Sequence, residues 1–191
     1  MMSHSSFNLR RGLACCLVAC VAFSANSFAE SIKSLIGKDN VYLLVNQHPD
    51  EGRQRMYTVN YQLPAVLPVC TKVRLTKLKR KYLEFEVPER GDREYRYYLH
   101  KSLPGDFQDH LAEIFGTDCP DISKMSKKDQ EGIKAGRPLV GMTKKGVLIA
   151  MGPPPAHVTY STDLDTWVYW VNRFNKQNVE FKDGKVSKVI D

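Results

Sequence analysis

The sequence predicts an α+β protein in two parts: a β-rich N-terminal part with one helix, and a C-terminal part with two helices and a three-stranded antiparallel sheet. Three observations support this prediction. Short apolar segments separated by turn residues fill residues 40–103, helix start and stop signals follow residue 120, and Asp183-Gly184 separates two strand-like segments. The 191 residues are 42% apolar and 26% charged, which excludes a disordered chain. The formal charge of +7 favours anionic partners without naming their kind.

The first residues have the pattern of a bacterial secretory signal. Arg10 and Arg11 precede an apolar run over residues 12–23, and small and polar residues follow up to Ala29. We therefore expect residues 1–29 to be a signal peptide, cleaved between Ala29 and Glu30, and the chain to be periplasmic. The alternative is a lipobox, Leu17-Val18-Ala19-Cys20, in which Cys20 would carry the lipid and associate the protein with the outer membrane.

Five strands are expected in the N-terminal part, residues 30–122. The β-prone segments are residues 41–45, 56–61, 69–78, 82–87 and 95–99. Short strands joined by turns predict a small SH3-like or other partly open β-barrel. Asp106 is expected to cap a helix whose apolar face is Phe107, Leu111, Ile114 and Phe115, with Gly116 as its C-terminal residue and the barrel beneath it.

The C-terminal part, residues 123–191, has clear helix signals. Ser126 begins a short helix that ends near Gly136, and Thr143 begins a second one that ends at Gly152. Three strands are expected at residues 166–171, 178–182 and 185–190. Asp183-Gly184 is typical of a two-residue type I′ turn, which would pair Phe181 with Val186 and Val179 with Lys188.

The C-terminal part resembles a known family over about residues 124–191. The residues that carry the resemblance are Gly141-Met-Thr143, Val147, Gly152-Pro153, Trp167-x-Tyr169, Val179-x-Phe181, Asp183-Gly184-Lys185 and Val189. In this order they resemble the SmpA/OmlA domain, the fold of the outer-membrane assembly factor BamE. The resemblance implies a periplasmic protein of the machinery that inserts β-barrels into the outer membrane. A typical member carries little more than this domain behind a lipidated cysteine, whereas a long β-rich region precedes it here.

Two cysteines lie outside the signal, and the exported location predicts a disulfide between Cys70 and Cys119. His100 and His110 raise the alternative of a cysteine hydrolase. No nucleophile motif surrounds either cysteine, and no histidines or cysteines lie at metal-ligand spacing. We therefore predict no catalytic residues, cofactor or metal.

The densest charge cluster of the chain is Lys72, Arg74, Lys77, Lys79, Arg80 and Lys81. Strand alternation places Lys72 and Arg74 on one face and the other three lysines on the opposite face, so a bend near Thr76 is needed to unite them. The cluster is either a solvated hairpin rim or a site for an anionic surface such as lipid phosphates or lipopolysaccharide. Nucleic acid is not expected for an exported chain, although Tyr95, Tyr97 and Tyr98 could supply stacking.

The aromatic strand 166–171 has two faces. We expect Trp167 and Tyr169 to pack on the helix that contains Val147 and Met151, and Trp170 to face outward. The outward face either contacts the N-terminal part or, together with Arg173 and Phe174, binds a partner. These features predict a non-enzymatic cell-envelope protein that assists outer-membrane protein assembly or envelope integrity by binding protein or lipid. The alternative is an envelope hydrolase or an inhibitor of one.

Overall fold

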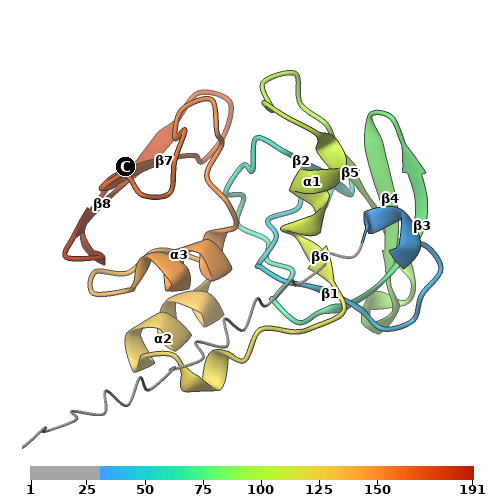
Figure 1. The fold of residues 1–191 in the computed structure, drawn as a ribbon, viewed down its shortest axis with the longest axis horizontal. Helices are drawn as coiled ribbons and strands as arrows, with labels where there is room; N and C mark the ends of the chain where they lie inside the picture. The colour runs from blue at the N-terminus through green and yellow to red at the C-terminus, as the bar shows by residue number, and fades with distance from the viewer. Residues whose placement is uncertain (1–30) are drawn as a thin grey trace, which may run out of the picture.

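The computed structural model describes residues 31–191, which form two bodies lying side by side (Figure 1). The predicted signal peptide and Cys20 lie outside the described residues. A curled six-stranded sheet forms one body, and two helices with a three-stranded sheet form the other. The mixed α+β class is therefore confirmed.

The larger sheet has the strand order β2-β5-β4-β3-β1-β6. Its strands are β1 (Val41–Leu43), β2 (Arg55–Tyr57), β3 (Lys72–Lys79), β4 (Tyr82–Val87), β5 (Arg93–Tyr98) and β6 (Phe115–Gly116). Neighbouring strands are antiparallel except β2 and β5, which are parallel. The second strand is shorter than predicted because the chain turns at Asn60, which has a left-handed φ of 55°.

The helix of the larger body is also shorter than predicted. Asp106 caps α1 (Phe107–Ala112) by accepting a hydrogen bond from the Gln108 amide, but the helix ends before Phe115. Phe115 instead pairs with Leu43 in β6, a strand that was not predicted, and Gly116 pairs with Tyr42. The expectation that Gly116 ends the helix was therefore wrong, because these residues form backbone hydrogen bonds with β1 instead.

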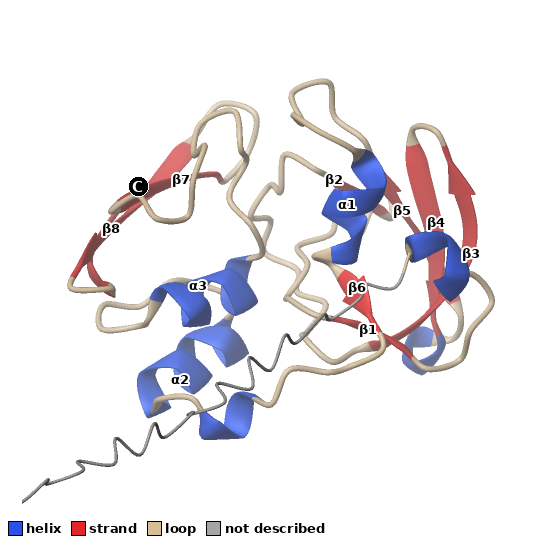
Figure 2. Ribbon diagram, in the orientation of Figure 1, coloured by secondary structure: helices blue, strands red, loops and turns tan. Residues whose placement is uncertain are grey.

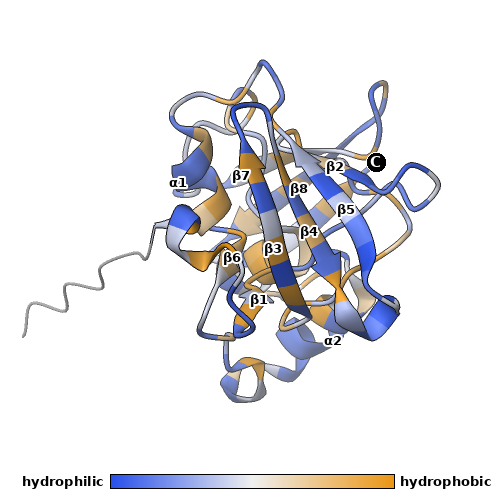
Figure 3. Cartoon of the chain, turned by 90° about the vertical axis from the view of Figure 1, so that its right-hand side faces the viewer, coloured by the Kyte–Doolittle hydropathy of each residue, from blue (hydrophilic) through white to orange (hydrophobic). Residues whose placement is uncertain are grey.

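The core of the larger body lies between the inner face of the sheet, α1 and the 3₁₀ turn η1 (Ile32–Leu35). The residues of β3 and β4 alternate between this core and solvent, as the hydropathy bands in Figure 3 show. The fully buried side chains include Leu75, Leu83, Phe85, Tyr95 and Tyr97. Two further 3₁₀ turns are η2 (Pro88–Arg90) in the β4–β5 loop and η3 (Ile122–Lys124) before the smaller body.

The helices of the smaller body are α2 (Lys127–Ala135) and α3 (Lys144–Met151), and both predicted caps are confirmed. The Ser126 hydroxyl accepts a hydrogen bond from the Asp129 amide, and the Thr143 hydroxyl accepts one from the Gly146 amide. The buried carboxylate of Asp129 joins the two caps, because it accepts hydrogen bonds from the Thr143 amide at 2.7 Å and from its hydroxyl at 3.1 Å. The same carboxylate accepts a hydrogen bond from the Ser126 hydroxyl, so it contacts the cap residues of both helices.

The three-stranded sheet has the order β7 (Thr166–Trp170), β8 (Lys176–Lys182) and β9 (Lys185–Ile190), and α2 and α3 lie on one side of it (Figure 2). Trp167 and Tyr169 are fully buried in one cluster with Val147 and Met151, as predicted. Tyr169 also donates a hydrogen bond to the Gly152 carbonyl at 3.0 Å.

The β8–β9 register is confirmed at one predicted pair and wrong at the other. Phe181 pairs with Val186, but a bulge follows and Val179 pairs with Val189 rather than Lys188. Val186 and Val189 are three residues apart, so a regular strand would point them to opposite faces. The bulge lets both pack on the same core, and the Ser187 hydroxyl bonds the Glu180 carbonyl beside it.

Polar side chains from the loop between β1 and β3 join the two bodies. The buried amide of Asn46 donates to the carbonyls of Ile133 and Ala150, at 2.7 and 3.1 Å, and its oxygen accepts from the Val69 amide. Asn60 donates to the Met151 and Pro153 carbonyls. These side chains add hydrogen bonds at the C-terminal carbonyls of α2 and α3, where partners within a helix run out. The Ile133 carbonyl also accepts one from the Gly136 amide. The junction between the two bodies is therefore held by specific hydrogen bonds between polar groups.

Candidate functional site

A bulge in β3 unites the basic residues that alternation alone would separate. Leu75 pairs with Phe85 and Lys77 pairs with Glu84, which leaves Thr76 as the extra residue. Arg74 and Lys77 therefore lie on the same outward face, together with Lys72 and Lys79, while Val73, Leu75 and Leu78 pack in the core. The bend that the sequence required near Thr76 is present.

Two of the six basic residues are paired with carboxylates. The Arg74 guanidinium lies 3.1 Å from Glu86, 3.6 Å from Asp39 and 3.7 Å from Asp92, and the Lys77 ammonium lies 3.9 Å from Glu84. The hydrogen bond from Arg74 to Glu86 raises the pKa of the guanidinium above its usual range. Both cations thus belong to a solvated lattice of alternating charges on the outer face of the sheet, where ion pairs contribute little stability.

The other four basic residues of the cluster are exposed, and none lies within ion-pair distance of a carboxylate in residues 31–191. Lys79, Arg80 and Lys81 are consecutive and form the turn between β3 and β4, while Lys72 lies at the other end of β3. The unpaired charge is therefore concentrated at the β3–β4 turn.

A groove of about 650 Å³ lies beside this turn, between β3, η1 and α1. Its cations are Lys33, Lys77, Lys79 and Arg80, and its apolar residues are Ile36, Leu78 and Phe107. The one carboxylate that lines it in residues 31–191, that of Asp106, already accepts a hydrogen bond from the Gln108 amide as the helix cap. We call the β3–β4 turn and this groove the cationic groove. Sequence reasoning missed Lys33, Ile36 and Phe107 because they come from elements distant in the chain, and no local pattern links them to the turn.

The predicted aromatic partner surface is partly covered. Trp170 is half-buried, with the ring of His157 stacked on it at 6.3 Å and the Lys176 ammonium 4.5 Å from its ring centre. The Trp170 indole N–H is buried without a hydrogen-bond partner among the described residues. Phe174 is 75% exposed, and the exposed Arg173 guanidinium lies 4.5 Å from its ring centre. The loop between α3 and β7 therefore covers much of the outward face, and Arg173 and Phe174 remain exposed.

The N-terminal part also reaches the aromatic strand. The Gln62 amide donates a hydrogen bond to the Trp170 carbonyl at 2.8 Å. This contact is made by the backbone at the edge of β7, so the outer face of the strand is covered mainly by its own body.

The structure corrects one expectation about stacking residues. Tyr95 and Tyr97 are fully buried, so neither can stack on a nucleic-acid base from the surface. They alternate with Arg96 and Tyr98, which lie on the outer face. Tyr98 is half-buried and already stacks on Tyr57, with ring centres 5.6 Å apart.

The predicted disulfide joins Cys70 and Cys119, whose Cα atoms are 5.3 Å apart. It links the start of β3 to the loop that follows β6, so both thiols are consumed. Residues 31–191 contain no group of three or more histidine, cysteine or acidic side chains placed to hold a metal ion. In the same residues, no helix has the length and apolar character needed to span a membrane.

The two histidines that raised the hydrolase alternative make separate contacts. His100 bonds the Ser102 hydroxyl, two residues away, at 2.7 Å, and the Ser102 amide bonds back to it, which makes a local turn. Burial lowers the pKa of His100, with smaller contributions from His157 and Lys101. His110 lies next to the Tyr97 hydroxyl at 2.9 Å, in the core of the larger body. The structure brings neither histidine together with Cys70 or Cys119.

Comparison with known proteins gives no relative to argue from. No family model, curated protein or solved structure matches the chain. The surfaces described above are therefore the basis for a functional proposal.

Proposed function

We propose that the protein is an exported, non-enzymatic protein of the cell envelope that binds an anionic lipid surface through its cationic groove. The observation that carries this proposal is the set of cations at the β3–β4 turn that have no carboxylate partner in residues 31–191, beside a groove whose lining includes Ile36, Leu78 and Phe107. Lipid phosphates, including those of lipopolysaccharide, would meet the cations. The apolar lining residues would contact the acyl chains next to the phosphates.

The charge is sufficient for such binding. Each lysine or arginine near an anionic membrane surface contributes about 1 kcal/mol. Lys33, Lys79, Arg80 and Lys81 have no carboxylate within ion-pair distance in residues 31–191, so their charge is available to phosphates. Arg74 and Lys77, by contrast, are paired with Glu86 and Glu84 on the strand, so the available charge is confined to the turn and the groove beside it.

The smaller body supplies the protein-binding half of the proposal. Two helices followed by a three-stranded antiparallel sheet is the arrangement implied by the resemblance to the SmpA/OmlA domain, which supports a role beside outer-membrane assembly components. The curled sheet of the larger body likewise supports a small SH3-like barrel. We propose that Arg173, Phe174 and the accessible edge of Trp170 contact an envelope protein while the cationic groove holds the chain at the periplasmic face of the membrane.

Vesicle binding tests the proposed contact with anionic lipid directly. The exported protein is sedimented with vesicles that contain either an anionic phospholipid or only zwitterionic lipid. We expect binding only to the anionic vesicles, and the Lys79→Gln/Lys81→Gln variant should bind about 30-fold more weakly, since two cations are lost.

A matched control comes from the other hairpin of the molecule. Lys182→Gln/Lys185→Gln removes the same charge from the β8–β9 turn, where both lysines are exposed. This variant should bind almost as well as the wild type. Equal losses in the two variants would mean that only net charge matters, and equal binding to zwitterionic vesicles would remove the anionic surface from the proposal.

A further inference from the structure

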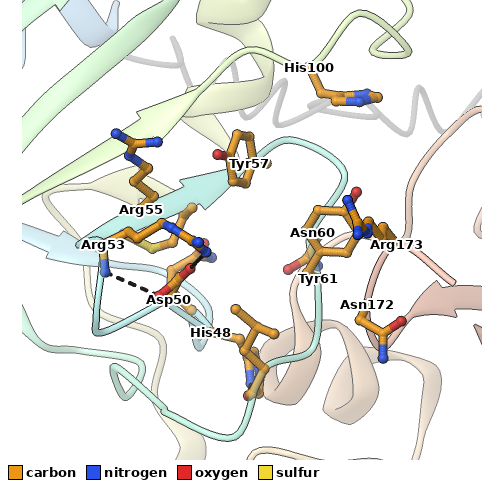
Figure 4. Close-up of a pocket in the computed structure, with 13 residues that line it drawn as sticks. His48, Asp50, Arg53, Arg55, Tyr57, Asn60, Tyr61, His100, Asn172 and Arg173 are labelled. Atoms are coloured by element: carbon orange, nitrogen blue, oxygen red, sulfur yellow. Dashed lines mark hydrogen bonds and ion pairs between the residues drawn. The ribbon is translucent and has the colours of Figure 1, made fainter. Parts of the chain in front are cut away.

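A second cavity lies between the two bodies, away from the cationic groove. It has a volume of about 420 Å³ and is lined by the loop that contains β2, by His100 and by residues 172–173 of the β7–β8 loop (Figure 4). Arg55, from the larger body, and Arg173, from the smaller body, line opposite sides of it (Figure 4). We call it the interbody cleft. Its walls are held in place by the Asn46 and Asn60 hydrogen bonds to the ends of α2 and α3.

Positive charge in the interbody cleft is only partly compensated. The one carboxylate among its lining residues, Asp50, accepts hydrogen bonds from the Arg53 amide and guanidinium, both at 3.1 Å. Arg55 and Arg173 lie over aromatic rings, those of Tyr98 and Phe174, and neither has a carboxylate within ion-pair distance in residues 31–191. Two guanidinium groups are therefore left for a ligand.

The neutral groups of the cleft add mostly donors. No side chain or backbone group in residues 31–191 bonds the hydroxyls of Tyr57 and Tyr61, which line the cleft. The Asn172 side-chain oxygen accepts from the Phe174 and Asn175 amides, which leaves its NH₂ group to donate. Burial lowers the pKa of His48, so this histidine is neutral near pH 7 and the charge of the cleft comes from arginine.

The same donor set already holds a carboxylate elsewhere in this protein. Glu51 accepts hydrogen bonds from Arg90 at 2.7 Å, from Arg93 at 2.9 Å and from the Tyr95 hydroxyl at 3.0 Å. Two guanidinium groups and a tyrosine hydroxyl thus bind one carboxylate beside the cleft. The interbody cleft presents the same kinds of donor, two guanidinium groups and two tyrosine hydroxyls, and no carboxylate in residues 31–191 pairs them.

We propose that the interbody cleft binds an acidic peptide segment, with Arg55 and Arg173 each contacting one of its carboxylates. Planar guanidinium groups match a carboxylate through paired hydrogen bonds, and side-chain amides such as that of Asn172 suit a peptide backbone. A base or sugar ring is less well matched. One face of Tyr57 already stacks on Tyr98, and the ring of Tyr61 lies at a T-shaped angle to it with ring centres 6.1 Å apart, so Tyr57 is already engaged by two aromatic rings. This site is independent of lipid binding at the cationic groove.

Peptide binding to the full exported chain tests the proposal. The probe is a fluorescent hexapeptide with blocked ends and alternating Glu and Ala residues, and its Gln counterpart is the neutral reference. The Glu peptide should bind and the Gln peptide should not. Arg55→Gln and Arg173→Gln should each weaken binding about tenfold, since each removes charge-assisted hydrogen bonds. Arg173→Lys, which keeps the charge but loses the planar fork, should give a smaller loss.

Controls separate the cleft from net charge and from loss of folding. Lys79→Gln removes one charge from the cationic groove and should leave peptide binding unchanged, and thermal melts should show the same stability for all four variants. A third peptide, neutral but with a free C-terminus, distinguishes a terminal carboxylate from side-chain carboxylates, and binding of either kind supports the proposal. Inorganic phosphate is added as a competitor.

Three outcomes would overturn the proposal. The first is no binding of any carboxylate peptide. The second is an equal loss of binding in Lys79→Gln, and the third is binding of phosphate at the cleft with no binding of the Glu peptide. The vesicle experiment changes other residues. A failure of peptide binding at the cleft can therefore be distinguished from a failure of lipid binding at the cationic groove.

Discussion

The outer faces of the two sheets carry different kinds of side chain. On the six-stranded sheet the outer face is a lattice of paired charges, in which Glu84 contacts Lys77 and Arg96 while Arg74 contacts Glu86, and the pairing ends at the β3–β4 turn. On the three-stranded sheet the outer face carries Trp170, which the body's own loop covers through His157. A charged face leaves its unpaired cations available to an anionic surface. An aromatic face must be covered, either by the chain itself or by a partner.

The inner faces are more alike, because each packs on helical elements to form a separate apolar cluster. The clusters are joined by polar contacts, chiefly those of Asn46 and Asn60. A polar junction of this kind fixes one orientation of the two bodies, since its buried groups are satisfied only there. Substitutions at the inner face, the outer face and the junction should therefore change the stability of the protein by different amounts.

The largest difference in stability is expected between variants of two residues of β7, Trp167 and Trp170. Trp167 is fully buried, packs 4.6 Å from the Phe181 ring centre and donates to the Leu164 carbonyl, so Trp167→Ala should cost about 3–5 kcal/mol of unfolding free energy. Trp170→Ala should cost much less, because its ring is half-exposed and its N–H has no partner to lose in residues 31–191. Urea unfolding of both variants measures the difference.

The same two variants separate structure from partner binding. In co-purification from solubilised envelope, Trp170→Ala should lose a partner that the wild type retains, if the outer face binds protein as proposed. A large loss of stability in Trp170→Ala with the partner still bound would instead make Trp170 a packing residue only.

The disulfide is expected to stabilise the larger body more than the smaller body. It closes a loop over a sequence separation of 49 residues that contains β3, β4, β5, α1 and β6, and chain entropy assigns such a loop about 4 kcal/mol. Cys70→Ser should lower the thermal midpoint, and Cys70→Ser/Cys119→Ser should match it because one change already removes the bridge. Both thiols should resist alkylation until a reductant is added. Free thiols in the oxidised native protein would contradict the bridge.

Acid should destabilise the larger body through His110. Burial lowers the pKa of His110 to about 4 from an ordinary value of 6.5, so the unfolded chain binds a proton more readily between these values. The stability contributed by the neutral histidine is present above pH 6.5 and is lost as the pH falls to about 4. The loss is at most about 3 kcal/mol. Chemical denaturation across this pH range should therefore show falling stability.

A variant isolates this histidine from its neighbours. Burial raises the pKa of Glu113, which acts in the opposite sense, because that stability is lost as the pH rises above about 4.5. His48 keeps a pKa lowered by burial and contributes a slope of the same sign as His110. His110→Phe retains both of these and should flatten the dependence between pH 6.5 and 4. An unchanged slope in His110→Phe would show that His110 is not the titrating group.

The junction is expected to show the smallest of these effects. Asn46→Ala removes the side-chain hydrogen bonds to the Ile133 and Ala150 carbonyls and leaves the Val69 amide without its side-chain partner, which should cost about 2 kcal/mol. Asn46→Asp keeps the shape and the acceptor but loses the donor, so it should also destabilise. Separate unfolding of the two bodies in either variant, seen as two transitions, would mean that Asn46 is what makes them unfold together.

Local signals predicted much of this fold. The cap residues Ser126 and Thr143 and the end points of β4 and β9 are set by short-range chemistry, namely side chains that satisfy helix ends and apolar residues that alternate. The disulfide followed from there being two cysteines outside the predicted signal peptide, because a predicted export signal implies an oxidising compartment. Each of these features can be read within a few residues or from composition.

The missed features depend on distant partners. The two-residue strand β6 exists because β1, far earlier in the chain, offers it hydrogen bonds, and no pattern of Phe115 and Gly116 indicates this. The pairing of Val179 with Val189 follows from a bulge that the type I′ turn does not specify. Asn46 and Asn60 read as ordinary loop residues, since nothing local shows that they would reach the ends of α2 and α3.

Hydrogen exchange on anionic vesicles tests the difference between the two outer faces most directly. Backbone amides of the oxidised protein are compared free and vesicle-bound at two turns, residues 79–82 between β3 and β4 and residues 182–185 between β8 and β9. Binding through the cationic groove predicts exchange slowed at the first turn and unchanged at the second. Slowing at the β8–β9 turn alone, or at neither turn while the protein remains bound, would contradict it.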